Sequence, residues 1–278
     1  MISRADFQDR SLLSTPRSTP IARRLAAGLL KQRRKAIAVA SIAAFLLIWQ
    51  ATAHLGVNTS LFPPPTRVVQ ALINMLFHEH FINDILASSR RLMIGYVAGA
   101  ALGLIIGLMT GRFELLADVI GPVIQLIRPI PPISFVPIAI FWFGLGEFSK
   151  YFLVFWGVFF PVWLNVHLGV KNVEEIYLRA ARCLGAGEAR LLFSVVFPGA
   201  LPMILAGLRT AIPISFYTLV AAEIAGAYSG IAYRIDVAQL SMRIGHMFAG
   251  LVVLGVMSAA ADKAFVAVTK RLFRWAYP

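Results

Sequence analysis

The stretch LMIGYVAGAALGLIIGLMTG, residues 92–111, contains no charged residue. About twenty apolar residues in an α-helix are enough to cross the hydrocarbon core of a bilayer, so this stretch predicts a transmembrane helix. Its glycines recur at every fourth position, at Gly95, Gly99, Gly103 and Gly107. Small residues at that spacing form a groove along one helix face and let another helix approach closely. The sequence therefore predicts a packing seam on this span.

Five further stretches are apolar and long enough to span a bilayer, and they lie near 36–56, 119–143, 150–170, 199–225 and 245–267. The whole chain is 59% hydrophobic and only 14% charged, whereas a soluble domain is roughly 25% charged. We therefore expect an all-α polytopic membrane protein with six transmembrane helices. Residues 36–278 are predicted to form one six-helix transmembrane domain.

The distribution of basic residues predicts the topology. The chain has 26 Lys and Arg residues against 13 Asp and Glu. With the N-terminus in the cytoplasm, eighteen of the basic residues fall in cytoplasmic segments and six on the opposite side. This asymmetry favours cytoplasmic N- and C-termini by the positive-inside rule. The basic excess is thus explained by topology, and nucleic acid is not an expected partner.

Residues 1–35 form a basic segment before the first span. Within it, IARRLAAGLLKQRRK at 21–35 places apolar residues on one helical face and basic residues around the rest. This pattern favours an amphipathic helix on the cytoplasmic leaflet, and a solvated basic tail is the alternative. The histidines are dispersed and Cys183 is a single cysteine, so no metal site is predicted.

A charged segment, NVEEIYLRAARCLGAGEARLLFSVVFP at 172–198, separates two of the apolar stretches. Asn172 and Glu175 have the spacing of a capping box, which predicts a helix start at Asn172. Gly185 supplies a residue that can adopt the left-handed conformation and end this helix. A second helix is then expected to run to Pro198, where the next span begins.

Charged residues inside the predicted spans are candidates for a translocation pathway, because an intramembrane arginine must face protein or water. Arg128 and Arg209 are two such residues, and Glu223 is a deeply placed acid. Arg128 either draws an anion toward a gate or forms a structural pair with Glu223 or with helix-end carbonyls. The prolines that follow it break the helical hydrogen bonds at 129, 131 and 132, namely Pro129, Pro131 and Pro132. Phe141 belongs to an aromatic run that fits either a gate or an interfacial belt.

Two blocks resemble a known family. Arg179-Ala180-Ala181, followed by Gly185 and by Val195, Phe197 and Pro198, resembles the EAA loop of membrane permeases in ATP-binding-cassette importers. RPIPPISFVPIAIFWFGLGEFSK at 128–150 is similar to the nitrate, sulfonate and taurine branch. PGALPMILAGLR at 198–209 also resembles the family. Arg179 stands where the motif has glutamate, and Ala232 stands where a glycine is often seen.

The resemblance implies the type I importer permease fold in the bacterial inner membrane. It implies a second permease copy in a homodimer, two ATP-binding subunits and an extracytoplasmic solute-binding protein. The segment 172–198 would be the coupling helix, with these residues at the ATPase contact: Arg179, Ala180, Ala181, Leu184, Gly185 and Pro198. None of the six lysines follows a glycine, so the chain has no P-loop, and ATP and Mg²⁺ are expected on the partner ATPase.

The expected cargo is a small oxyanion such as taurine, another sulfonate or nitrate. A neutral pyrimidine-like or flavin-like heterocycle in the same importer class is the first alternative. An ion-coupled secondary carrier is a weaker one, because such a carrier should show an inverted repeat and several intramembrane acids. A membrane-embedded enzyme would need a clustered nucleophile or acid–base pair, and the sequence shows none.

Overall fold

The computed structural model describes residues 20–55, 61–273 and 275, and the chain divides into two compact units, Met1–Pro65 and Thr66–Pro278. The first unit is built on α1 (Pro20–His54), whose apolar part, Ala36–His54, matches the first predicted span. The helix continues without a break from Pro20, so residues 20–35 extend the span helix. Their location on the leaflet stays a prediction, and residues 1–19 lie outside the described residues.

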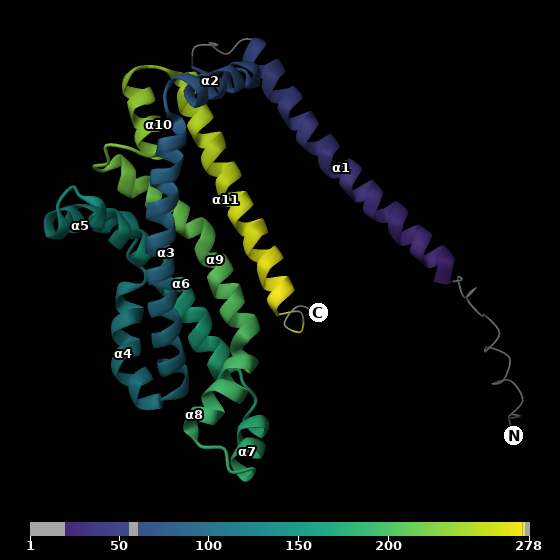
Figure 1. Ribbon diagram of the computed structural model, residues 1–278, viewed down its shortest axis with the longest axis vertical. Coiled ribbons are helices and arrows are strands. Elements are labelled where there is room, and N and C mark those ends of the chain that lie inside the picture. Colours follow the sequence, from purple (N-terminus) through teal and green to yellow (C-terminus); the bar gives the residue numbers. More distant parts are fainter. Residues whose placement is uncertain (1–19, 56–60, 274, 276–278) are drawn as a thin grey trace, which may run out of the picture. The chain divides into compact units, whose positions relative to one another are not determined.

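In the second unit, the regular elements within the described ranges are all helical (Figure 1). They are α2 (Pro65–His78), α3 (Phe81–Arg112), α4 (Glu114–Ile127), the 3₁₀ turn η1 (Pro132–Phe135), α5 (Val136–Phe143), α6 (Glu147–Lys171), α7 (Glu175–Cys183), α8 (Glu188–Leu191), the π-helical turn η2 (Leu192–Val196), α9 (Phe197–Ile224), α10 (Ile231–Leu240) and α11 (Ile244–Leu272). α7 and α8 lie at one end of this unit, here called the α7 end. α10 lies at the other, here called the α10 end.

The predicted spans near 92–111, 150–170, 199–225 and 245–267 are confirmed as parts of α3, α6, α9 and α11. The predicted span 119–143 is broken instead, because α4 and the segment Pro132–Phe143 meet at 88°. The cause is local: prolines at 129, 131 and 132 have no N–H to donate, so the i to i−4 hydrogen bonds cannot continue. Among the described residues there are thus five long apolar helices and one bent pair.

The centre of the second unit is the contact between α3 and α6, and it confirms the predicted packing seam. Each seam glycine of α3, with Gly111 added, lies against α6, where valines recur at the same interval: Val154, Val158, Val162, Val166 and Val170. A Cβ on any of these glycines would lie within 3.0 Å of an α6 atom. The seam is therefore filled within the chain by α6.

Replacing Gly99 by alanine is expected to destabilise the fold. The new Cβ would lie 2.6 Å from the Phe155 carbonyl oxygen, so α3 and α6 must move apart. Overpacking of this kind costs about 1–3 kcal/mol, and we expect a thermal midpoint several degrees lower in detergent. Gly121→Ala in α4 is the matched control, because nothing would lie within 4 Å of the Cβ that it adds. Equal midpoints for both variants would contradict the seam.

Small apolar clusters hold the bent pair against the centre. Ile124 of α4 packs on Phe159, Phe160 and Trp163 of α6. Ala139 of α5 is fully buried with Leu153 of α6 and Ala222 of α9. These contacts place the break between α4 and α5 on the surface of the α3–α6–α9 core.

Candidate functional site

The helix α7 begins later than the sequence predicted. The capping-box prediction is wrong, because Asn172 is the C-cap of α6 and its N–H donates to the Leu168 carbonyl. Because α6 continues to Lys171, the backbone N–H of Asn172 is used at the end of that helix and does not begin a new one. The N-cap of α7 is Glu174, whose side chain makes no capping hydrogen bond.

The end of α7 confirms the prediction for Gly185, which has φ of +79°. The Gly185 N–H donates to the Arg182 carbonyl at 2.9 Å, and the Ala186 N–H donates to the Ala181 carbonyl at 3.0 Å. This pair of bonds is a Schellman motif, and its left-handed position favours glycine. No atom would lie within 4 Å of a Cβ added at Gly185, so a substitution there is strained by backbone conformation alone.

One face of α7 is apolar and uncovered, since no residue of this helix is buried. Ile176, Tyr177 and Leu184 are 66%, 58% and 86% exposed. Ala180 is exposed between them on the same helical face, whereas Ala181 is half-buried. An exposed cluster of large apolar side chains marks an interaction surface. We name Ile176, Tyr177, Ala180 and Leu184 the α7 patch.

Arg179 and Pro198 lie outside the α7 patch. Arg179 pairs with Glu175 at 3.3 Å, with both side chains more than half exposed, and such a pair adds little stability. Pro198 does not begin a separate span: helical structure runs from Glu188 through the π-turn into α9, and Pro198 lies in the first turn of α9. Proline has no N–H to donate, and Pro198 follows directly on the π-helical turn Leu192–Val196, where the regular i to i−4 pattern is already interrupted.

The break after α4 exposes the residues predicted for a gate. Arg128 is the C-cap of α4 and is exposed, as are Pro129 and Pro131, while Pro132 is half-buried. Phe141 on α5 is 87% exposed. Within the described residues Arg128 forms no ion pair. The structure thus presents an uncommitted guanidinium beside a broken helix.

A pocket of about 500 Å³ lies between α4 and α6, and Arg128 lines it. Its polar lining residues are Asp118, Gln125, Arg128, His167 and Lys171. Such a volume is within the range of small-molecule sites. The lining carries two permanent cations and one anion, so it has an excess of positive charge.

The orientation of His167 in this pocket follows from its hydrogen bonds. The Thr110 hydroxyl donates its proton to the Ile106 carbonyl at 2.8 Å, and it accepts from Trp163 Nε1 at 3.1 Å. His167 Nδ1 lies 3.0 Å from the same oxygen, and which of the two groups donates depends on the tautomer of the imidazole ring.

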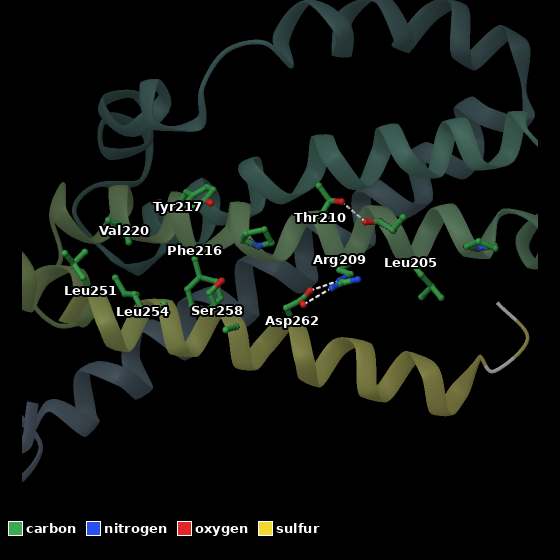
Figure 2. Close-up of a pocket in the computed structure, with 15 residues that line it drawn as sticks. Leu205, Arg209, Thr210, Phe216, Tyr217, Val220, Leu251, Leu254, Ser258 and Asp262 are labelled. Atoms are coloured by element: carbon green, nitrogen blue, oxygen red, sulfur yellow. Dashed lines mark hydrogen bonds and ion pairs between the residues drawn. The ribbon is translucent and has the colours of Figure 1, made fainter. Parts of the chain in front are cut away.

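A larger groove of about 1070 Å³ runs between α9 and α11 (Figure 2). Arg209 of α9 points across it to Asp262 of α11, with Nε and Nη2 at 2.7 and 2.9 Å from the two carboxylate oxygens. Most of the other lining is apolar, including Leu205, Leu251 and Leu254. Arg209 therefore lines this groove, and its charge is balanced by a bidentate partner. Its place in a translocation pathway stays a prediction.

Glu223 is not in either cavity. Its side chain is fully buried and pairs with Arg91 at 2.9 Å, so the suggested pair of Glu223 with Arg128 is wrong. The sequence interpretation missed Arg91 because it counted this residue outside a span that was predicted to begin at residue 92. In the structure α3 begins at Phe81, ten residues earlier in the chain than Arg91. The spacing of Asp84, Ser88 and Arg91 on one helical face was the available signal.

Comparison with known proteins identifies related chains. Residues 99–274 match a family described as binding-protein-dependent transport system inner membrane component. The taurine transport system permease protein of Escherichia coli is 32% identical over 249 residues, which cover 87% of this chain and 90% of that protein. The nitrate import permease protein of Synechocystis is 29% identical over 84% of this chain and 86% of its own length.

Two further comparisons agree. A putative aliphatic sulfonates transport permease protein of Bacillus subtilis is 32% identical over 84% of this chain and 85% of that protein. Among solved structures, the methionine ABC transporter in inward-facing conformations superimposes with a TM-score of 0.59 at 18% identity. That match covers 71% of this chain and 96% of the other, and it supports the fold.

Proposed function

This chain belongs to the family of binding-protein-dependent transport system inner membrane components and is a permease of an ATP-binding-cassette importer, and on that premise we propose that it carries a small oxyanion across the membrane. The single observation that supports this cargo is Arg128, an uncommitted guanidinium at the break between α4 and α5. An arginine at membrane depth has to face protein, water or a charged ligand. Related permeases are named for taurine, aliphatic sulfonates and nitrate, each of which presents anionic sulfonate or nitrate oxygens.

The pocket between α4 and α6 supplies further groups for such an anion. Gln125, Arg128 and Lys171 offer N–H donors to sulfonate or nitrate oxygens. Arg128 presents a planar fork that matches two oxygens of one anion. Arg209 is the weaker candidate, because its Nε and Nη2 already donate hydrogen bonds to the Asp262 carboxylate.

The proposed assembly contains two copies of this permease, two ATP-binding subunits and an extracytoplasmic solute-binding protein, all on a lipid bilayer. We place the α7 end in the cytoplasm together with both termini, because the basic residues concentrate in those segments. The α7 patch then faces the ATP-binding subunit, and its exposed apolar side chains suit a protein groove. ATP and Mg²⁺ would be held by that subunit, since this chain has no P-loop lysine.

Uptake by the reconstituted transporter tests the proposal. Proteoliposomes containing the permease, its ATP-binding subunit and the cognate binding protein should accumulate radiolabelled taurine, ethanesulfonate or nitrate only when ATP is present. Excess unlabelled oxyanion should compete, and uncharged uracil or riboflavin should not. Accumulation that only the neutral heterocycles inhibit would replace the oxyanion proposal with the heterocycle alternative.

Arg128→Gln is expected to raise the half-saturating oxyanion concentration for uptake about tenfold or more, because a charged hydrogen bond worth about 1.5–3 kcal/mol is lost. ATP hydrolysis without substrate should stay within about twofold of wild type. Lys263→Gln is the control, since it removes one exposed cation from α11 at a distance from the pocket lining. Equal half-saturation in the two variants would remove Arg128 from the pathway.

A further inference from the structure

A set of charged side chains lies at the α10 end, where α3, α6, α9 and α10 meet. Three cations and three anions make up this set: Arg91, Lys150, Arg234, Asp84, Glu147 and Glu223. At its edge, half-buried Glu79 also pairs with Arg234, at 3.8 Å. All of them are buried or half-buried. None lines the α4–α6 pocket or the α9–α11 groove.

Arg91 is the centre of this set, and its side chain is only 2% exposed. Its Nε and one Nη2 proton bind the two carboxylate oxygens of Glu147, at 2.8 and 2.6 Å. Nη1 donates to Glu223 Oε1 at 2.9 Å and to the Ser229 carbonyl at 2.6 Å. The remaining Nη2 proton reaches Ser229 Oγ at 3.1 Å. All five N–H donors of the guanidinium are thus used.

On one side of Arg91, buried side chains hold the start of α10. The Ala232 N–H donates to Glu223 Oε2 at 2.9 Å, and the Ile231 N–H donates to Ser88 Oγ at 2.9 Å. The Gly230 N–H donates to Asp84 Oδ1 at 2.8 Å. The first N–H groups of a helix have no partner in that helix, so α3 and α9 supply the cap.

Gly230 allows this close approach. Its φ is +121°, and a Cβ would lie 2.5 Å from the Glu223 carboxylate. Only glycine combines that backbone conformation with that space. The turn between α9 and α10 is therefore built around the Glu223 carboxylate.

On the other side, Arg91 holds the turn between α5 and α6 through Glu147, which lies in the first turn of α6. Lys150 Nζ donates to the Leu145 and Gly146 carbonyls of this turn, at 2.8 and 2.9 Å. Leu145 also packs against the opposite turn, since a Cβ on Gly226 would lie 2.6 Å from Leu145 Cδ2. The two turns are in contact, and Arg91 is the ionic link between them.

We infer that Arg91 is a positioning residue that ties the α5–α6 turn to the α9–α10 turn, so that the two turns move as one unit during transport. A buried ion cluster whose hydrogen bonds are all made gives little net stability over apolar packing. Each of these hydrogen bonds nevertheless restricts the relative positions of the two segments that it joins. α5, which carries the exposed Phe141, cannot then shift without shifting the start of α10 unless the Arg91–Glu147 bonds break. The inference rests on the proposed function, because it concerns motion in an importer whose binding protein docks at the α10 end.

The test uses Glu147→Gln in the complete transporter in nanodiscs, because this change keeps the side-chain shape and weakens the Arg91 link on one side only. Amide hydrogen exchange of residues 144–149 should become about tenfold faster, whereas residues 230–232 should stay protected by Asp84, Ser88 and Glu223. Stimulation of ATP hydrolysis by taurine-loaded binding protein should fall about tenfold, with hydrolysis in its absence unchanged. Arg91→Lys should act in the same direction, since an ammonium group cannot hold both carboxylates in the fork geometry.

Arg90→Gln is the control, because it removes the other arginine that pairs with Glu147. Arg90 is adjacent to Arg91, its side chain is 63% exposed, and its Nη2 lies 3.6 Å from the Glu147 carboxylate. Exchange and stimulation in Glu147→Gln that equal those of Arg90→Gln would overturn the inference. Faster exchange at 144–149 with full stimulation would also overturn it, because the turns would then not need to move together. Absence of stimulation in the wild type would instead contradict the proposed function, and the exchange measurement would still decide whether Arg91 ties the turns.

Discussion

Ala180→Glu is expected to leave the permease inserted in the membrane and to weaken its association with the ATP-binding subunit at least tenfold. Ala180 lies in the middle of the α7 patch, flanked by Ile176, Tyr177 and Leu184, whose side chains are all more than half exposed. If this patch docks in a protein groove, a glutamate there must clash or be buried without a partner. Burial of an unpaired charge costs several kcal/mol, and each 1.4 kcal/mol is a factor of ten in affinity. Co-purification of the ATP-binding subunit and binding-protein-stimulated ATP hydrolysis measure the effect.

Gly185→Asp tests the same contact by another route. Its side chain would enter open space, but φ of +79° costs a non-glycine residue roughly 1–2 kcal/mol. The chain after α7 would then leave the helix in a different direction, so association with the ATP-binding subunit should weaken in this variant also. Glu174→Gln, an exposed residue just before α7, is the control and should be nearly silent. Normal assembly and full stimulated hydrolysis in Ala180→Glu would show that α7 is not the coupling helix.

Arg91→Leu is expected to have the largest effect on stability. The substitution leaves the Glu223 carboxylate, 1% exposed, with only the Ser88 hydroxyl and the Ala232 N–H as donors. Breaking a buried ion pair by removing one partner costs about 3–5 kcal/mol, because the remaining charge is not compensated. We expect a large loss of folded protein and a thermal midpoint in detergent lowered by about ten degrees or more.

Arg90→Leu is the matched control for this stability prediction. Its ion pair with Glu147 is largely solvent-exposed at the arginine and should contribute about 0–1 kcal/mol. Combining Arg91→Leu with Glu223→Gln should recover part of the midpoint, because the double variant buries an amide in place of an unpaired carboxylate. A midpoint for Arg91→Leu equal to that of Arg90→Leu would show that Glu223 is stabilised by its other partners alone.

Features that depend on local periodicity and local backbone conformation could be predicted from the sequence. Apolar length identified the spans that became α3, α6, α9 and α11, because a helix must satisfy its own backbone hydrogen bonds in a bilayer. Glycine at every fourth position of α3 predicted a close helix contact, and Gly185 predicted the left-handed end of α7. The family resemblance rested on equally local motifs, such as the block at residues 128–150.

Contacts across long separations in the chain became visible only in the folded molecule. Arg91 and Glu223 are 132 positions apart, and Arg209 and Asp262 are 53 apart, so no local pattern specifies either pair. The glycine seam likewise could have received another copy of the chain, and only packing shows that the valines of α6 fill it. Asn172 could have capped the start of α7 or the end of α6. Because α6 extends to Lys171, the Asn172 N–H donates to the Leu168 carbonyl and caps the end of α6. Ion pairs and helix contacts of this kind depend on how whole helices are placed relative to one another. That placement is decided only in the folded chain, where each buried polar or charged group must find a partner.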